Sequence, residues 1–134
     1  MNIFEIPRYT WWESMELIIQ NVNLDSVTMM QNNHLKFTFS NSYNGAFYKN
    51  LECSKILKCN IENTFEDEVF SYFILDIYAK ELSEEELQSA LTYYKYGYNV
   101  NFSELGKQKL VVIIGSEICI DILCGKIDII PHDI

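Results

Sequence analysis

Hydrophobic and polar residues near the start of the chain repeat with the period of a helix. Between Trp11 and Val22 the apolar residues recur at intervals of three or four positions, which is the spacing of one helical face. Thr10 and Glu13 are three residues apart, as in a capping box. The pattern therefore predicts an amphipathic helix over about 10–21.

From residue 35 onward the period changes to two, as expected for strands. Residues 35–39 alternate between apolar and polar side chains. The dipeptide Asn44-Gly45 follows, and it favours a tight hairpin turn. The alternation resumes over 47–61 with Ile56 on the otherwise polar side, which indicates either a bulge or a second contact surface there.

A third strand and a second helix are predicted in the middle of the chain. Residues 69–79 are mostly apolar or aromatic on both faces, which is typical of a central strand covered on both sides. The run 82–87, Leu-Ser-Glu-Glu-Glu-Leu, contains a capping box and a hydrophobic staple. Gly97 is suited to end the helix that begins there.

The last part of the chain predicts a second hairpin. Residues 109–114 and 117–124 are strand-like, and a Gly-Ser turn separates them. The apolar residues change parity afterwards, so we expect a bulge near 123–125. We therefore predict one α+β domain over residues 1–134, with a mainly antiparallel sheet of about five strands and two helices in the order α-β-β-β-α-β-β.

The composition agrees with a single folded domain. The 134 residues are 49% hydrophobic and include only 2 Pro and 5 Gly, which is too apolar for a disordered chain. No run of about 18 apolar residues is present, so we expect no membrane helix. The first residues do not have the charged and then apolar pattern of a secretory leader, so we expect a cytoplasmic protein.

The net charge narrows the range of partners. It is −9, and the ten basic residues are scattered, which argues against direct binding of nucleic acid. The same repulsion disfavours an anionic membrane. Between Glu62 and Glu86 nine acidic residues accompany one basic residue, Lys80, and leave a charge of −8. A basic protein is therefore the expected partner.

Acidic and aromatic clusters supply the candidate partner-binding residues. The acids in the first turn of the predicted second helix are also favoured by the helix dipole, whereas those before the third strand have no such structural reason. The tyrosines near the end of that helix combine apolar area with a hydroxyl, as at interfaces, although packing under the following loop is the alternative. The candidates are Glu62, Glu66, Asp67, Glu68, Glu84, Glu85, Tyr93, Tyr96 and Tyr98.

No motif for catalysis, cofactor binding or metal binding stands out. His34 and His132 lack the partners of a catalytic triad, and the glycines are too dispersed for a phosphate loop. The cysteines and acids have no metal-ligand spacing. We expect reduced, buried thiols, with only a cross-pairing between the two pairs of cysteines open to a disulfide. These pairs are Cys53 with Cys59, and Cys119 with Cys124.

Several of these segments, taken in order, resemble small acidic immunity proteins of bacterial polymorphic-toxin and contact-dependent-inhibition systems. They are Asn63-Thr64-Phe65-Glu66-Asp67-Glu68, the strand over 70–81, Tyr93–Tyr98 and the hairpin at 118–124. The resemblance is one of general pattern over roughly residues 35–130. It implies a cytosolic, non-enzymatic inhibitor that binds a toxic nuclease domain, often basic, and blocks its substrate site or a nearby surface.

The leading hypothesis is therefore a cytoplasmic protein that neutralises a basic partner, without cofactor or metal. A second hypothesis is a small-ligand-binding or hydrolytic domain that uses a carboxylate on a sheet face. Asp76 and Asp121 lie inside apolar runs and are the candidates for that role. A third hypothesis is a homo-oligomeric interaction module that associates through exposed aromatic residues.

Overall fold

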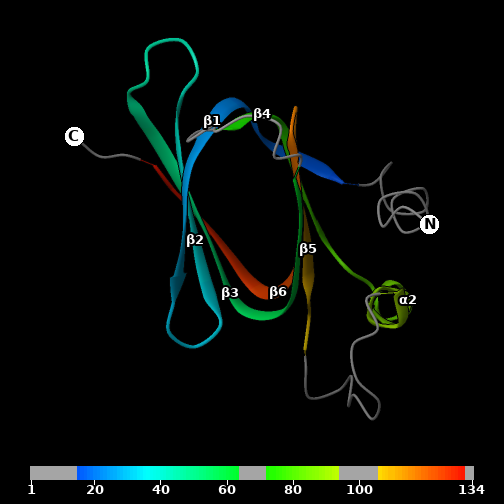
Figure 1. Ribbon diagram of the computed structural model, residues 1–134. Coiled ribbons are helices and arrows are strands. Elements are labelled where there is room, and N and C mark those ends of the chain that lie inside the picture. Colours follow the sequence, from blue (N-terminus) through cyan, green and yellow to red (C-terminus); the bar gives the residue numbers. More distant parts are fainter. Residues whose placement is uncertain (1–14, 64–71, 94–105, 132–134) are drawn as a thin grey trace.

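Six antiparallel strands of the chain close into a barrel. A computed structural model describes residues 15–63, 72–93 and 106–131. The elements within them are β1 (Glu16–Met30), β2 (His34–Asn41), β3 (Phe47–Asn63), β4 (Tyr72–Glu81), α2 (Glu84–Tyr93), β5 (Lys109–Gly115) and β6 (Ile118–Pro131). The strands follow one another around the barrel in the order β1-β2-β3-β6-β5-β4, and β4 pairs with β1 to close it (Figure 1).

The predicted sheet of about five strands with two helices is wrong, because the described residues hold six strands and one helix. The helix expected over 10–21 is the main error, since residues 16–21 lie in β1, while residues 10–14 lie outside the described residues. The register of β1 shifts between Leu17 and Ile19, and Asn21 has a φ of 55°. Ile19 and Val22 consequently both face the core although they are three positions apart. A bulged strand thus imitates the spacing of a helical face.

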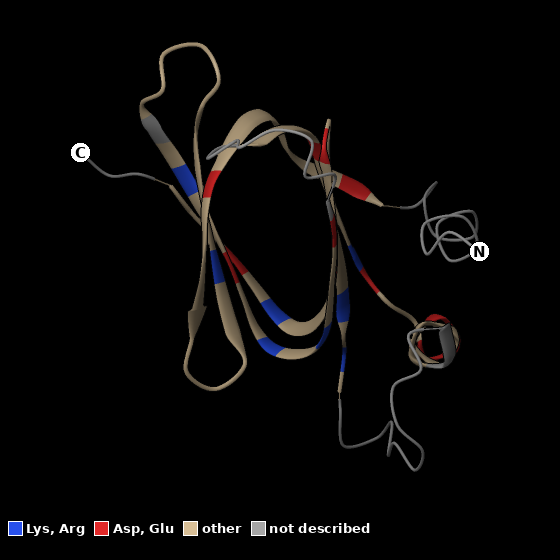
Figure 2. Ribbon diagram, in the orientation of Figure 1, with Lys and Arg blue, Asp and Glu red and all other residues tan. Residues whose placement is uncertain are grey.

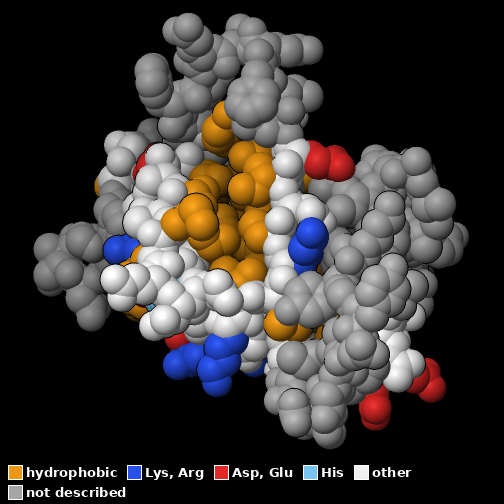
Figure 3. All heavy atoms as spheres, turned by 60° about the horizontal axis from the view of Figure 1, so that its bottom comes forward, with side chains coloured by type: hydrophobic (Ala, Val, Ile, Leu, Met, Phe, Trp, Pro, Cys, Tyr) orange, Lys and Arg blue, Asp and Glu red, His pale blue; other side chains and the backbone are white. Residues whose placement is uncertain are grey.

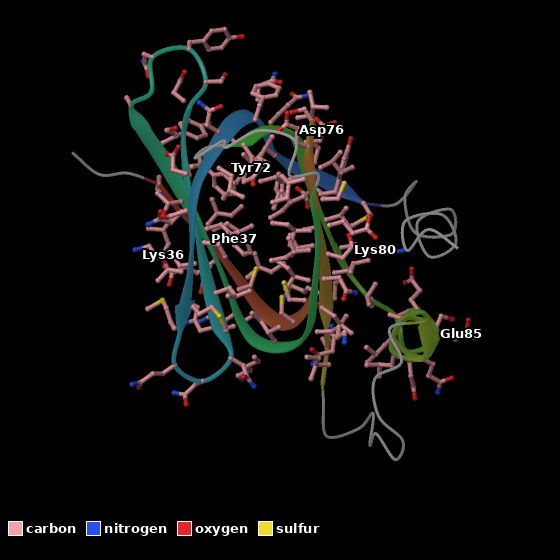
Figure 4. All side chains as sticks on the ribbon, in the orientation of Figure 1. Lys36, Phe37, Tyr72, Asp76, Lys80 and Glu85 are labelled. Atoms are coloured by element: carbon pink, nitrogen blue, oxygen red, sulfur yellow. The ribbon has the colours of Figure 1, made fainter. Side chains whose placement is uncertain are left out.

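Apolar side chains fill the interior of the barrel. Figure 4 shows Phe37 of β2 and Tyr72 of β4 pointing inward. The largest fully buried side chains of the barrel interior are Phe37, Phe39, Leu51, Ile74, Ile77, Ile113, Ile120 and Ile122. A small barrel filled in this way is a packed core rather than a pore. On the face seen in Figure 3, hydrophobic side chains also reach the surface in a hollow.

The strands β3 and β6 bend together at the lower end of the barrel in Figure 1. Lys55 in the bend has a φ of 54°, and a Cβ on Gly125 would lie 3.1 Å from the Cβ of Lys55. The register of the two strands shifts between Ile56 and Lys58. The bulge predicted near Ile56 is therefore confirmed, and the bend lets both strands contribute to both walls of the barrel.

Both predicted hairpins are confirmed. Between β2 and β3 the N–H of Gly45 donates to the carbonyl oxygen of Asn41 at 2.8 Å, and Gly45 has the positive φ of 72° that the turn requires. β5 and β6 are joined by the short turn after Gly115, and the N–H of Ser116 donates to the carbonyl oxygen of Phe73 at 3.2 Å. This second turn is therefore bonded to β4.

Helix α2 packs on the outside of the barrel, over β5 and β6. The hydroxyl oxygen of Ser83 accepts the N–H of Glu86 at 3.2 Å, and the Ser83 N–H donates to Oε1 of Glu86 at 3.0 Å. The predicted capping box is confirmed. The apolar cluster beneath the helix consists of Leu82, Leu87, Ala90, Leu91, Leu110, Val112 and Leu123. Among the described residues no helix is both long and apolar enough to cross a membrane.

Candidate functional site

A bulge in β4 decides which side chains accompany Asp76. Ile74 pairs with Gly115 of β5 and Asp76 pairs with Ile114, so Leu75 is an extra residue on β4. Ile74 and Ile77 both face the core, and Asp76 is outside (Figure 4). The sequence pattern predicts Tyr72 on the same face as Asp76, which is wrong because the bulge reverses the parity of the strand. Tyr72 packs against the core instead.

Exposed apolar residues surround Asp76 on the outside of β1 and β4. Leu17 is 44% exposed, Phe73 37% and Leu75 44%. Gln20 of β1 lies directly opposite Asp76 of β4. We call these five residues, Leu17, Gln20, Phe73, Leu75 and Asp76, the β1–β4 face. A carboxylate within exposed apolar area is the composition of an interface, where anchoring residues lie among polar groups.

Asp76 is held in place by hydrogen bonds within this face. Nε2 of Gln20 donates to Oδ1 of Asp76 at 3.1 Å, and the Tyr78 hydroxyl donates to Oδ2 at 3.4 Å. Desolvation, together with the negative charge of Asp76 and this hydrogen bond, raises the pKa of Tyr78 above its ordinary value. The Tyr78 hydroxyl therefore stays protonated at neutral pH and continues to donate its proton to the carboxylate.

The second candidate carboxylate does not join Asp76. Asp121 is buried on β6 and lies opposite Val112 of β5, while Asp76 lies opposite Ile114. β5 thus separates the strands that carry the two carboxylates, which places their backbones about 10 Å apart at the least. The shared pocket that an acid–base pair needs is not formed by these two residues. In the part of the chain that the structure describes, no three ligand-type side chains gather as a metal site would require.

The structure places four of the nine predicted partner-binding residues. Glu62 is exposed near the end of β3. Glu84 and Glu85 are exposed in the first turn of α2, and Glu85 points away from the barrel in Figure 4. Tyr93 is the last residue of α2. The remaining candidates, Glu66, Asp67, Glu68, Tyr96 and Tyr98, lie outside the described residues.

The acids around α2 differ in how far they are neutralised. Although burial opposes its ionisation, the contacts of Glu86 with Lys80 and Ser83 hold the pKa of this carboxyl below its ordinary value. Glu81 forms a loose ion pair with Lys107 at 3.7 Å, and both side chains are at least half exposed. Neither Glu84 nor Glu85 has an ion-pair partner among the described residues. The start of α2 therefore keeps exposed negative charge.

Acidic and basic side chains are unevenly distributed over the molecule. Figure 2 shows acidic residues along the right-hand side, from the start of β1 to the end of β4 and α2. Lysines lie towards the lower end of the barrel, on its left wall together with further acidic residues, and on β4 and β5 at the right. The β1–β4 face thus lies on the side where the acids of β1, β4 and α2 are found, which suits a positively charged partner.

The apolar members of the β1–β4 face could not be identified from the sequence. Leu17 falls within the predicted helix, and Phe73 and Leu75 fall within a run that is apolar on both faces. Their exposure depends on the two bulged strands that pair there, and no local signal marks a bulge within a continuous apolar run.

Three of the four cysteines, Cys53, Cys59 and Cys124, belong to the core of the barrel. All four are free thiols, with Cys53 and Cys124 buried and Cys59 and Cys119 partly buried. The side-chain hydrogen bond with Cys124, together with burial, raises the pKa of Cys53. Burial and the charge of Asp121 raise the pKa of Cys59 to about 11. Cys53 and Cys59 are therefore protonated and unreactive at neutral pH.

Comparison with known proteins identifies the fold but no activity. A crystal structure of an uncharacterized protein from Neisseria gonorrhoeae is similar to this chain with a TM-score of 0.60 and 23% sequence identity, over 88% of this chain and 98% of that one. At this identity the similarity shows the fold alone. Residues 17–131 match the model of a protein family described only as "-like". No curated protein matches the chain.

Proposed function

We propose that this chain, which belongs to the family whose model matches residues 17–131, is a cytoplasmic, non-enzymatic protein that binds and neutralises a basic protein partner. The partner that its charge and pattern favour is the nuclease domain of a cognate toxin, so that the chain acts as an immunity protein.

The β1–β4 face is the observation that carries this proposal. Leu17, Phe73 and Leu75 offer apolar area that a partner can bury, and Asp76 is pre-oriented between them by Gln20. Anchors of this kind supply most of the binding energy when they are desolvated at the centre of an interface. A cation of the partner, for example an arginine, would find in Asp76 an acceptor that is already in position.

The acids at the start of α2 support the charge of the proposed partner. Glu84 and Glu85 are exposed at the start of α2, where the positive end of the helix dipole would otherwise dominate. Charges at the rim of an interface mainly raise the association rate of an oppositely charged partner. We therefore assign the apolar residues to affinity and these glutamates to the association rate.

The proposal is tested by searching the genes next to this chain for a toxin-like protein with a basic nuclease domain and by purifying that domain. The purified chain should bind that domain and suppress its cleavage of nucleic acid. Replacement of Phe73 and Leu75 together by serine should weaken binding about tenfold or more, through faster dissociation. Tyr43→Ser is the matched control, because Tyr43 is 91% exposed in the turn between β2 and β3.

Charge reversal separates the two parts of the interface. Glu84→Lys combined with Glu85→Lys should slow association and reduce its dependence on salt, while dissociation stays nearly unchanged. The proposal is contradicted if the unmodified chain neither binds nor inhibits the nuclease domain. It is also contradicted if the serine variant of the β1–β4 face binds as tightly as the Tyr43 control.

A further inference from the structure

The bend in β3 and β6 brings two cysteines together inside the barrel. Cys53 of β3 lies opposite Ile127 of β6. Cys124 of β6 lies opposite Ile56 of β3, three positions further along the pair. In a straight pair of strands this offset would separate the two cysteines by about 10 Å along the strands, which is too far for their side chains to meet. At the bend, where Lys55 has a φ of 54°, the inner faces of the strands turn towards each other, so residues on its two sides converge.

The two thiols are in direct contact. A side-chain hydrogen bond joins Cys53 and Cys124. Both side chains are fully buried, and both belong to the apolar core of the barrel. A pairing of this kind, between β3 and β6, is the one that the spacing of the cysteines leaves open. Sulfurs already in contact need only a short approach to reach the S–S bond length of about 2.05 Å.

The surroundings of the pair give the two thiols different roles. The hydrogen bond from the Cys53 thiol holds the pKa of Cys124 below its ordinary value, although burial opposes ionisation. The backbone N–H of Lys126 and the charge of Lys109, which lies directly opposite on β5, also lower this pKa. Cys53 keeps its proton, because the same hydrogen bond and burial raise its own pKa. Since the thiolate is the reactive form of cysteine, Cys124 is the nucleophile of the pair.

The pair lies just beneath the surface of the bend. Gly125, the residue after Cys124, is half-buried, and Lys55, two residues after Cys53, is exposed. A Cβ on Gly125 would lie 3.1 Å from the Cβ of Lys55, so this lysine packs directly over the backbone of the bend. Hydrogen peroxide is close to water in size and needs only a small displacement of that side chain to reach the thiols.

From this cluster of groups we propose that Cys53 and Cys124 form a redox-sensitive pair, which a peroxide converts into a disulfide across the bend. The Cys124 thiolate first attacks one oxygen of hydrogen peroxide. The O–O bond breaks, hydroxide leaves and takes up the proton that Cys124 had released, and Cys124 becomes a sulfenic acid. The Cys53 sulfur then attacks the Cys124 sulfur, the S–O bond breaks, and the leaving hydroxide takes the Cys53 proton. Two thiols are oxidised and one peroxide is reduced, which gives one disulfide and two molecules of water.

The first step prepares Cys53 for the second. The hydrogen bond and the negative charge of Cys124 are among the causes that raise the pKa of Cys53, and a sulfenic acid carries no charge. Cys59 is also part of the core, but burial and the charge of Asp121 raise its pKa. The disulfide is a reversible state, because thiols in a reducing compartment return it to the dithiol. The inference does not depend on the proposed function.

Peptide mapping of the folded, full-length chain tests the proposal. The reduced protein is freed of reductant, treated with hydrogen peroxide, alkylated in denaturant and digested with trypsin. Cleavage after lysine places Cys53 in peptide 50–55 and Cys124 in peptide 110–126. Mass spectrometry should find these two peptides cross-linked, with the loss of two hydrogen atoms, and the cross-link should disappear after treatment with dithiothreitol. Fragmentation of the larger peptide should place the link at Cys124 rather than at Cys119, which lies in the same peptide.

Two variants distinguish this pair from oxidation of any core thiol. Cys53→Ala should abolish the cross-link and leave Cys124 as a sulfenic acid, which dimedone captures. Cys59→Ala is the matched control, since it removes another core thiol of β3 and should form the cross-link as the unmodified chain does. Circular dichroism checks that each variant is folded.

The unmodified chain decides the outcome even if a variant does not fold. The proposal is overturned if this chain forms no cross-link with peroxide, or forms one only in urea. It is also overturned if Cys59 or Cys119 takes the place of Cys53 or Cys124 in the cross-link.

Discussion

Gly115 is the position where a single methyl group should disturb both the barrel and the β1–β4 face. It ends β5 and lies opposite Ile74, next to the bulge at Leu75. A Cβ at this position would be 2.7 Å from the carbonyl oxygen of Phe73 and 3.0 Å from side-chain atoms of Ile74 and Ile118. The first of these atoms belongs to the backbone of β4, so the strand itself must move.

We expect Gly115→Ala to lower the free energy of unfolding by about 3 kcal/mol, the upper part of the range for overpacking. In a chain of this length that loss corresponds to a fall of roughly 10 °C in Tm. Urea denaturation followed by circular dichroism gives the free energy, and the fluorescence of the aromatic residues gives an independent probe of the same transition.

Gly106→Ala is the matched control for this prediction. Gly106 has a φ of 68°, and a Cβ there would meet no atom within 4 Å. Alanine at this position costs only the left-handed conformation, about 1 kcal/mol. The reasoning is refuted if Gly115→Ala is as stable as the unmodified protein, or if it is destabilised no more than Gly106→Ala. In either case the close approach of the β5–β6 turn to β4 would not be the reason for a glycine at position 115.

Three further changes probe the core, the helix cap and the ion pair of α2. Phe37→Ala should lower the free energy of unfolding by about 3–5 kcal/mol because the side chain is fully buried in the barrel. Urea denaturation measures this loss. A loss no larger than that caused by truncating an exposed side chain would contradict the packed interior. Ser83→Ala should cost about 1 kcal/mol through loss of the cap on the Glu86 N–H, seen in the same assay. The folded-state pKa of Glu86 is lowered from 4.5, so its contribution to stability is present above that pH and is lost as the pH falls through the folded value. Lys80→Met should raise the pKa of Glu86, which a carboxyl titration by NMR measures, and an unchanged pKa would show that Lys80 does not stabilise the carboxylate.

Local chemistry allowed several elements to be predicted correctly. The Asn-Gly turn before β3 and the capping box of α2 depend on groups only a few residues apart, and both are present. The alternation in β2 placed Phe37 and Phe39 inside because that strand has no bulge before Phe39. Such sequence patterns are reliable because the residues that interact in them are close together in the chain.

The candidate site was predicted only in part. Glu84 and Glu85 are exposed at the start of α2, whereas Glu86 beside them is half-buried and paired with Lys80, and the role of Glu84 and Glu85 in partner binding stays a prediction. The sequence identified Asp76 as a candidate carboxylate, but regular alternation along β4 would place its apolar neighbours Phe73 and Leu75 on the opposite face of the strand. The assignment failed because an extra residue in β4 shifts every side chain after it by one position.

Composition and short-range patterns were enough to establish the antiparallel hairpins, helix α2 and the excess of acidic side chains, because these depend on residue counts or on residues close together in the chain. Long-range strand pairing was needed to make β1 a strand, to close the barrel through β1 and β4, and to expose Leu17, Phe73 and Leu75 together. Each of these outcomes depends on a bulge, and a bulge exists only relative to the strand on the other side of the hydrogen bonds.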